Sequence, residues 1–260
     1  MTGQLGGRVA IVTGAGDGIG AAVARAYVAE GARVTVAEID HDKGAAVAGD
    51  LGGDALFVPT DVGDRADIEA MVTRTIEHFG TVDILVNNAW GGGEISRFER
   101  KTDQGLERAM AVGFLGPVHA MQLTYPEMRA NRWGRVVNMC SLNGVNAHMG
   151  TTEYNSAKEA LRSATRTAAR EWAPTGVTAN IICPAAKSAS FRAVMAQHPE
   201  LEAAADQGNP MGRIGDPDAD VAPVAVFLAS EASRYVTGNT LFVDGGGHIN
   251  GSSWAPDLGD

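Results

Sequence analysis

Residues 8–20 have the sequence RVAIVTGAGDGIG, an apolar run followed at once by a glycine-rich segment. The apolar run is typical of a buried β-strand, and the residues after the glycines, through Glu30, form a helical pattern. Glycines allow a tight turn and let backbone N–H groups approach a phosphate at the start of a helix. The stretch therefore predicts a strand, a phosphate-binding loop and a helix, in the order found in dinucleotide-binding α/β folds.

The rest of the chain repeats this alternation of short apolar runs and longer amphipathic ones. Because the apolar runs are nearly continuous, they predict a parallel sheet covered on both faces. We expect a single-domain, Rossmann-type, doubly wound α/β sheet of about seven strands over residues 1–260. The predicted strands are 8–13, 33–37, 55–58, 82–86, 135–139, 177–182 and 240–243, and the later predicted helices are 65–79, 102–131 and 153–172. Residues 185–212 interrupt the alternation. We expect this segment to form a substrate lid, with a plain helical excursion on the surface as the alternative.

Composition and charge limit the function classes. The 260 residues carry 21 Lys and Arg against 31 Asp and Glu, a net charge of −10, which argues against a nucleic-acid partner. Apolar runs are too short to span a membrane, and residues 1–8 lack the apolar core of a signal peptide. Cys140 and Cys183 lie in apolar, strand-like segments, which favours buried reduced thiols over a disulfide framework or a reactive thiol. We expect a soluble cytoplasmic protein that binds no membrane.

The glycine-rich loop departs from the strict G-x-G-x-x-G pattern because Ile19 stands where that pattern needs glycine. It fits T-G-x-x-x-G-x-G instead, through Gly14, Gly18 and Gly20, with Asp17 and Ile19 between them. This loop can hold a pyrophosphate by the same physics, and a Gly-rich structural turn is the alternative.

Glu38 ends the second predicted strand, 18 residues after Gly20. An acid at this place accepts hydrogen bonds from the adenosine ribose and repels the extra phosphate of NADP. No Arg or Lys stands at 39 or 40, so the sequence favours NAD, with a solvated strand-end acid as the alternative. Asp61 and Val62 follow the third strand as adenine contacts, and Asn88 and Ala89 follow the fourth as residues lining the cofactor; each could equally be an ordinary turn residue.

Three further residues form a candidate catalytic group. Tyr154 and Lys158 stand four apart at the start of a predicted helix and so share one face. A lysine ammonium beside a phenol lowers the phenol pKa from about 10, which makes tyrosine usable as an acid or base. Ser141 follows the fifth strand, at the sheet edge that faces a cofactor crevice, where its hydroxyl can bond a substrate oxygen.

Taken in this order, the motifs resemble the short-chain dehydrogenase/reductase family in its common short form, over Arg8 to Gly247. The motifs are the Gly14/Gly18/Gly20 loop, Asp61, Asn87-Asn88-Ala89, Ser141, Tyr154 with Lys158, and Asp244-Gly245-Gly246. The resemblance implies that Tyr154 is the general acid/base, that Ser141 stabilises the substrate oxygen, and that Lys158 binds the nicotinamide ribose. It implies NAD as cofactor, no metal ion, and a homotetramer. Tyr154, Lys158 and Pro184 then join the cofactor-binding residues, with Pro184 near the nicotinamide carboxamide.

The sequence departs from the family pattern at three places. Gly113 replaces an asparagine that supports a water linking the lysine to solvent, which puts the proton relay in question. Trp90 replaces a glycine beside the nicotinamide site, where it either walls the substrate pocket or swings outward. Ala185 replaces the glycine after Pro184, and Ser188 or Ser190 replaces a threonine that follows it.

These observations leave more than one function open. The leading hypothesis is an NAD-dependent oxidoreductase that moves a hydride between a secondary alcohol or ketone and nicotinamide. A sugar, a steroid or an acyl carrier thioester is a broader substrate option, and the net charge and Glu38 argue against the last. A catalytically silent NAD-binding sensor is the alternative, motivated by Gly113, Trp90 and Ala185. The candidate pocket residues are Trp90, Asn143, His148 and Met149, of which His148 binds a polar substrate group or is only structural.

Overall fold

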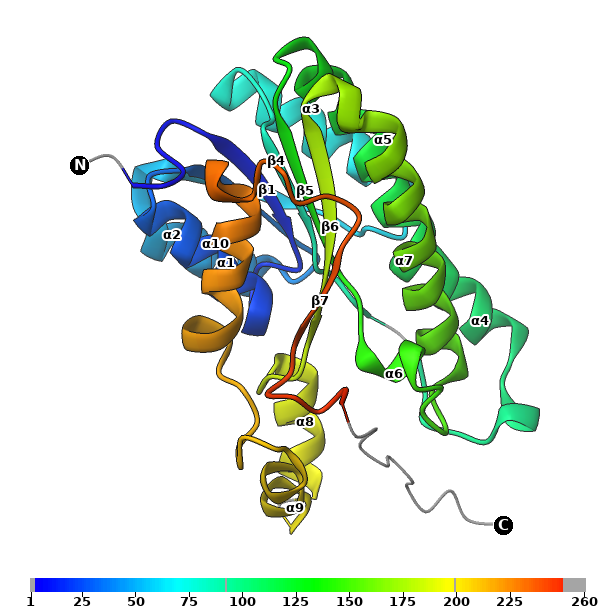
Figure 1. The fold of residues 1–260 in the computed structure, drawn as a ribbon. Helices are drawn as coiled ribbons and strands as arrows, with labels where there is room; N and C mark the ends of the chain where they lie inside the picture. Colours follow the sequence, from blue (N-terminus) through cyan, green and yellow to red (C-terminus); the bar gives the residue numbers. More distant parts are fainter. Residues whose placement is uncertain (1–2, 92, 199, 250–260) are drawn as a thin grey trace.

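A computed structural model describes residues 3–91, 93–198 and 200–249. Its centre is a seven-stranded parallel sheet in the order β3-β2-β1-β4-β5-β6-β7, which confirms the predicted doubly wound α/β fold (Figure 1). The strands are β1 (Val9–Thr13), β2 (Arg33–Glu38), β3 (Ala55–Pro59), β4 (Ile84–Asn87), β5 (Gly134–Met139), β6 (Val177–Pro184) and β7 (Thr240–Val243). Strand order reverses between β1 and β4, which opens a crevice at the carboxyl ends of those two strands.

Helices cover both faces of the sheet (Figure 1). The helices are α1 (Gly18–Ala29), α2 (His41–Leu51), α3 (Arg65–Phe79), α4 (Asp103–Met110), α5 (Gly116–Ala130), α6 (Leu142–Val145), α7 (Thr152–Trp172), α8 (Ala189–Gln197), α9 (Glu200–Gly208) and α10 (Ala222–Ala229). Side chains of successive strand residues point to opposite faces. Accordingly Val12 joins the core beneath α1 and α10, and its neighbour Ile11 joins the core beneath α3 and α5.

The structure differs from the sequence expectations at several elements, and helices α6 and α10 were not among the predicted ones. The single helix predicted over 102–131 is divided into α4 and α5 by a π-helical turn at Ala111–Leu115. The fourth strand begins at Ile84 rather than at residue 82. Helix α2, which the sequence analysis did not identify, begins where the Asp40 carboxylate accepts a hydrogen bond from the Lys43 N–H at 3.2 Å. The predicted lid segment contains α8 and α9.

Both cysteines are buried free thiols. Burial raises the pKa of each to about 12, so both stay protonated and neither is a nucleophile at neutral pH. Within the described ranges, no helix is long and apolar enough to cross a membrane.

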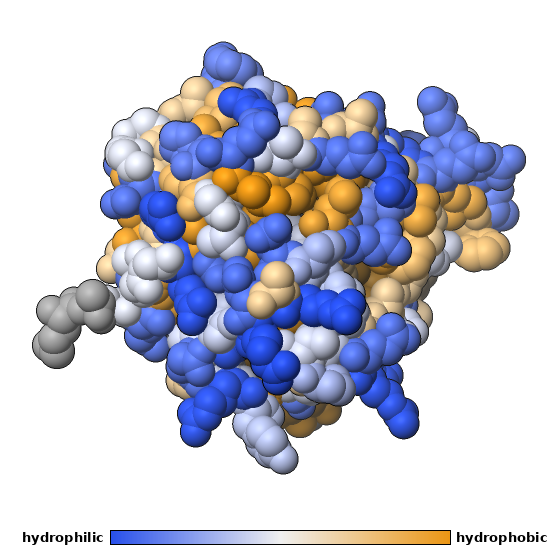
Figure 2. Space-filling view, turned by 90° about the horizontal axis from the view of Figure 1, so that it is seen from above, coloured by the Kyte–Doolittle hydropathy of each residue, from blue (hydrophilic) through white to orange (hydrophobic). Residues whose placement is uncertain are grey.

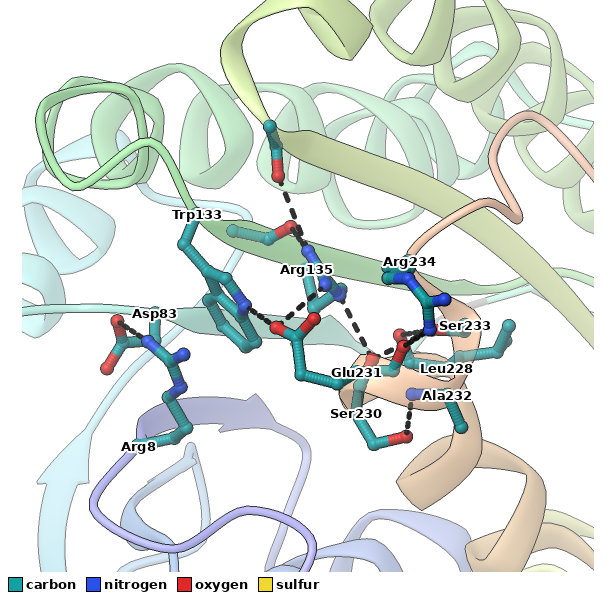
Figure 3. Close-up of polar contacts among 12 residues, drawn as sticks. Arg8, Asp83, Trp133, Arg135, Leu228, Ser230, Glu231, Ala232, Ser233 and Arg234 are labelled. Atoms are coloured by element: carbon teal, nitrogen blue, oxygen red, sulfur yellow. Dashed lines mark hydrogen bonds and ion pairs between the residues drawn. The ribbon is translucent and has the colours of Figure 1, made fainter.

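The amino ends of the strands lie on the side opposite the crevice, and Figure 2 shows that face as mostly hydrophilic with scattered apolar groups. A buried arginine, Arg135, organises this edge (Figure 3). Its side chain is 3% exposed and donates to the carbonyl oxygens of Gly134, Gly176 and Ser230 at 2.9, 3.4 and 3.3 Å. Its guanidinium also lies 3.4 Å from the Glu231 carboxylate. One side chain therefore joins the starts of β5 and β6 to the segment after α10.

We expect Arg135→Leu to lower the free energy of unfolding by about 2 kcal/mol, because it leaves buried carbonyl groups without donors. Glu231→Gln is the matched control, since Glu231 is 61% exposed and its ion pair is worth little. Urea denaturation of both variants measures the difference. Equal losses in the two variants would show that the ion pair, rather than the carbonyl bonds, supplies the stability.

Candidate active site

The glycine-rich loop packs its backbone more tightly than side chains allow. Gly14 and Gly18 have φ angles of +64° and +54°, a region that favours glycine. A Cβ atom on Gly20 would lie 2.1 Å from the Gly14 carbonyl oxygen, so only glycine fits there. Asp17 caps α1 by accepting a hydrogen bond from the Gly18 N–H at 2.6 Å, and Ile19 packs against the core. The first turn of α1 thus points its backbone N–H groups, which a helix leaves unpaired, toward the crevice.

Hydrogen bonds tie this loop to the end of β4. The Asn88 amide donates to the carbonyl oxygens of Thr13 and Gly14 at 3.0 and 3.1 Å. In return the Thr13 hydroxyl accepts from the backbone N–H groups of Asn88 and Ala89 at 3.0 and 3.1 Å. Thr13 is a residue whose role the sequence analysis passed over, although it is the threonine of the T-G-x-x-x-G-x-G pattern. Asn87 turns to the other side and donates to Asn138 Oδ1 at 2.8 Å.

Glu38 lies at the end of β2 beside the loop. Its carboxylate accepts hydrogen bonds from the backbone N–H groups of Gly16, Ile39 and Asp40 at 3.0, 2.9 and 3.1 Å. A carboxylate offers about four acceptor positions, so about one stays available to a ligand hydroxyl.

A lysine that the sequence analysis missed lies beside this acid. Lys43, in the first turn of α2, places its ammonium 3.9 Å from Asp17 and 4.0 Å from Asp40. The sequence analysis looked for basic residues only at 39 and 40. Asp40 is a typical helix-capping residue, and it indicates a helix start that brings Lys43, three residues later, into the first turn near the loop.

Three other predicted cofactor residues also have defined surroundings. The Asp61 carboxylate pairs with Arg108 of α4 at 3.0 Å and accepts from the Gly63 N–H at 2.8 Å, and these contacts hold the Asp61 pKa below its usual value against the opposing effect of burial. Val62 is half-buried, and its carbonyl oxygen lies against Gly116. Pro184 ends β6 beside β7, with which it is in register at Val243.

Ser141, Tyr154 and Lys158 lie together at the carboxyl edge of the sheet, from the end of β5 and the first turns of α7. Ser141 is 7% exposed and caps α6 by accepting from the Asn143 N–H at 3.1 Å. Lys158 is 3% exposed and its ammonium donates to the Met139 carbonyl oxygen at 2.8 Å. The ammonium lies 5.7 Å from the centroid of the Tyr154 ring.

The electrostatics of this group correct one expectation. The sequence analysis expected Lys158 to hold the Tyr154 pKa below 10. Burial instead raises the pKa of Tyr154 to about 12, and a hydrogen bond with Ser141 is the main contact that opposes this rise. Burial also lowers the pKa of Lys158. Burial therefore acts against the phenolate of Tyr154 and against the ammonium of Lys158, because a dry site penalises either charge.

Trp90 lies inward, against Tyr154. The two rings are arranged edge to face, with centroids 4.6 Å apart and planes at 76°. The indole also lies 5.5 Å from the Lys158 ammonium. Gly113, the other departure from the family pattern, is buried in the π-helical turn and faces the same indole.

The remaining predicted pocket residues lie around α6. His148 is half-buried, its backbone N–H donates to the Asn143 carbonyl oxygen at 2.9 Å, and burial lowers its pKa. His148 and Met149 line a cavity together with Phe98 and Asn155, and the catalytic group does not line that cavity. The predicted pocket residues are thus divided between Trp90 at Tyr154 and His148 with Met149 at a neighbouring cavity.

A buried ion pair lies one residue before Tyr154. Lys101 and Glu153 have side chains 6% and 3% exposed, with their charged atoms 2.7 Å apart. The Lys101 ammonium also donates to the Gly150 carbonyl oxygen at 2.9 Å, and Glu153 accepts from the Glu94 N–H at 2.9 Å. The pair therefore fastens the segment after β4 to the start of α7.

Helix α8 lies over the phosphate loop. A Cβ atom on Gly18 would come within 2.8 Å of the Ala189 backbone nitrogen. Arg192 of α8 forms an ion pair with Asp17, and Ser188 caps the helix by accepting from the Phe191 N–H at 3.2 Å. The predicted lid segment thus reaches the residues predicted to hold a cofactor.

The crevice fits a dinucleotide: it offers backbone N–H groups at the start of α1, a backbone cradle that a Cβ atom would fill at Gly20, and an acid with a free acceptor position at Glu38. Among the residues that the structure describes, no group of three or more His, Cys, Asp or Glu side chains is placed to hold a metal ion. Gly92 and the chain after residue 249 lie outside the described residues.

Known proteins resemble this chain over nearly its whole length. A family model described as enoyl-(acyl carrier protein) reductase matches residues 14–248. L-fucose dehydrogenase of Oryctolagus cuniculus is 36% identical over 247 residues, 94% of this chain and 86% of its own. Galactitol 2-dehydrogenase of Agrobacterium fabrum is 36% identical over 253 residues, 94% of this chain and 98% of its own. The crystal structure of levodione reductase superposes with a TM-score of 0.89 at 28% identity, covering 94% of this chain and 99% of that one. The chain therefore belongs to the short-chain dehydrogenase/reductase family and is related throughout to named oxidoreductases.

Proposed function

We propose that this protein is an NAD-dependent oxidoreductase that transfers a hydride between a secondary alcohol or ketone and nicotinamide, with Tyr154 as general acid/base. The observation that carries the proposal is the gathering of the buried Ser141 and Lys158 around the half-buried Tyr154 beside the crevice. The relatives named as dehydrogenases and reductases support the same reaction class.

Tyr154, Ser141 and Lys158 have separate roles in the proposed reaction. When bound, the nicotinamide supplies or accepts the hydride. Tyr154 gives a proton to the substrate oxygen in reduction and takes it back in oxidation. The Ser141 hydroxyl holds that oxygen, and the same hydroxyl stabilises the phenolate. Lys158, fixed by the Met139 carbonyl oxygen, supplies a positive charge on the tyrosine side of the site.

Two features support NAD over NADP. Glu38 ends β2 with a carboxylate, and an acid at this place disfavours the additional phosphate of NADP because like charges at close range repel strongly near a protein surface. Lys43 is shared between Asp17 and Asp40, so the cation beside the loop is already paired.

The proposal also includes a lid over the site, the assembly of the protein and its location. The predicted lid role of residues 185–212 is supported by the contact of α8 with the phosphate loop. The single-domain organisation, the homotetramer and the cytoplasmic location stay predictions from the sequence. The silent NAD-binding sensor stays the alternative, and the first experiment below decides between it and the enzyme.

We expect Tyr154→Phe to reduce nicotinamide-linked turnover at least about 100-fold, because it removes the proton donor. The assay follows nicotinamide absorbance with a panel of cyclic, sugar and steroid secondary alcohols and ketones. Tyr125→Phe is the matched control, since Tyr125 stacks on Trp172 away from the site. NADH binding by fluorescence should persist in both variants. A native protein that binds NADH but turns over no panel compound, and so has no turnover for Tyr154→Phe to remove, would be the silent sensor.

The raised pKa of Tyr154 predicts opposite pH behaviour for the two directions. Oxidation needs the phenolate, so its rate should rise with pH from about 7 to about 10, whereas reduction needs the phenol and should stay level. Ser141→Ala removes the hydrogen bond that lowers this pKa, and we expect it to displace the oxidation profile to higher pH. Steady-state rates in both directions across this range test the expectation. An oxidation rate that is already level near neutral pH would contradict it.

We expect Glu38→Gln to increase the preference for NADP over NAD by at least about tenfold, because it removes the charge while keeping an acceptor oxygen for the loop. The ratio of kcat/KM for the two cofactors measures this preference. Asp50→Asn, an exposed acid of α2 far along the same helix, is the control. A ratio that does not change would mean that Glu38 is only a cap for the Gly16 turn.

A further inference from the structure

The indole of Trp90 occupies a closely bounded space next to the catalytic group. Its Cζ2 atom lies 3.3 Å from the position of a Cβ atom on Gly93, on the side of the loop after β4. On another side it meets the edge of Tyr154, with ring centroids 4.6 Å apart. The indole is thus packed between a loop and α7, rather than displayed on the surface.

The third boundary of this space is Gly113. A Cβ atom on Gly113 would lie 2.7 Å from Trp90 Cζ3 and 2.8 Å from the Ala157 Cβ atom. Carbon atoms do not approach this closely, so any side chain at 113 and the indole at 90 exclude each other. Gly113 is not among the residues with a positive φ angle. The neighbouring side chains, rather than its backbone conformation, therefore require glycine at this position.

We propose that Trp90 and Gly113 act as a coupled pair, in which the missing side chain at 113 admits the indole and the indole positions Tyr154. This inference rests on the proposed function, because it concerns the same tyrosine. Trp90 is a positioning residue that acts through Tyr154. Its edge-to-face contact restricts the phenol ring, and its bulk keeps water from that side of the ring. The two departures from the family pattern then form one compensated change, which argues against the silent-sensor alternative.

The pair also affects Lys158. Its ammonium has three donors, and the Met139 carbonyl oxygen accepts from one of them at 2.8 Å. The indole ring lies 5.5 Å away, near enough for a cation–π attraction. Trp90, which stands where the family has glycine, therefore lies against both Tyr154 and Lys158.

A double-mutant cycle tests the coupling through turnover. We expect Gly113→Asn to lower kcat at least tenfold, because the new side chain displaces the indole toward Tyr154. We expect Trp90→Gly/Gly113→Asn to recover at least tenfold over Gly113→Asn alone, since the new side chain then meets no indole and only the Ala157 methyl group must adjust. Trp90→Phe should retain most of kcat because a smaller ring keeps the contact. A double variant whose kcat equals the product of the two single effects would overturn the proposal.

Stability gives a readout that does not depend on activity or on the larger asparagine. Gly113→Ala should lower the urea midpoint more in the protein that has Trp90 than in the Trp90→Gly protein, where the added methyl group meets Ala157 but no indole. Gly49→Ala is the control, because a Cβ atom on this exposed helical glycine contacts nothing within 4 Å. Equal lowering of the midpoint in both backgrounds would show that the two positions are independent.

The pH profile distinguishes positioning from a general loss of structure. Removing the indole admits water to the phenol, weakens the effect of burial, and should move the oxidation profile to lower pH by about one unit. The groups that face or act on Tyr154 are Ser141, Lys158, Cys140 and Cys183, with the Lys101–Glu153 ion pair one residue away. None of them changes in Trp90→Gly. A lower kcat with an unmoved profile would overturn the positioning role.

The Tyr154→Phe background separates this inference from the proposed function. If Trp90 acts through Tyr154, Trp90→Gly should cause no further loss of turnover once the hydroxyl is gone. A further loss of the same fold as in the native protein would overturn the inference and leave the proposed function intact. Full turnover in Tyr154→Phe would reject the proposed function, and the stability comparison at 90 and 113 would still decide whether the pair is coupled.

Discussion

The hydrogen bonds between the ends of β1 and β4 are the constraint on which the site depends. The strand order reverses there, and Thr13 and Asn88 exchange side-chain and backbone bonds across the gap. The same Asn88 amide holds the Gly14 carbonyl oxygen, which in turn touches Gly20 in the first turn of α1. Loop, helix start and β4 are therefore fixed to one another. Trp90 follows Asn88 by two residues, so these hydrogen bonds also restrict the position of its backbone.

Burial is the second constraint, and it acts on both members of the tyrosine–lysine pair. A dry site raises the pKa of the phenol and lowers that of the ammonium, so neither charge is stabilised by solvent. The stabilisation must come from fixed dipoles: the Ser141 hydroxyl for the phenolate, and the Met139 carbonyl oxygen for the ammonium. The Lys101–Glu153 ion pair keeps the start of α7 in place beside them. Such a site keeps a proton on Tyr154 at neutral pH, which prepares it to act as an acid.

The sequence predicted the parts that local patterns determine. Apolar runs predicted the strands, and the spacing of Tyr154 and Lys158 predicted one helix face, because both follow from backbone periodicity. Contacts between distant segments left no local pattern. The pairing of Arg192 with Asp17, of Arg108 with Asp61, and the direction of the Tyr154 pKa shift depend on which helix covers which loop. The π-helical turn that divides the helix over 102–131 contains Gly113, a residue type that disrupts helices.

Gly113 and Trp90 illustrate why single positions mislead when they are compared with a family pattern one at a time. Taken alone, a glycine in place of asparagine suggests a lost polar group, and a tryptophan in place of glycine suggests a blocked pocket. Protein interiors are close-packed, so the space left by a missing side chain must be filled by another group or remain a cavity. The side chain missing here is the one at Gly113, in the π-helical turn that packs against α7. Here the space is filled by the indole of Trp90, from a loop 23 positions earlier in the chain. The indole contacts both Gly113 and Tyr154. In three dimensions these two departures from the family pattern are one exchange of volume beside Ser141, Tyr154 and Lys158, the proposed catalytic group.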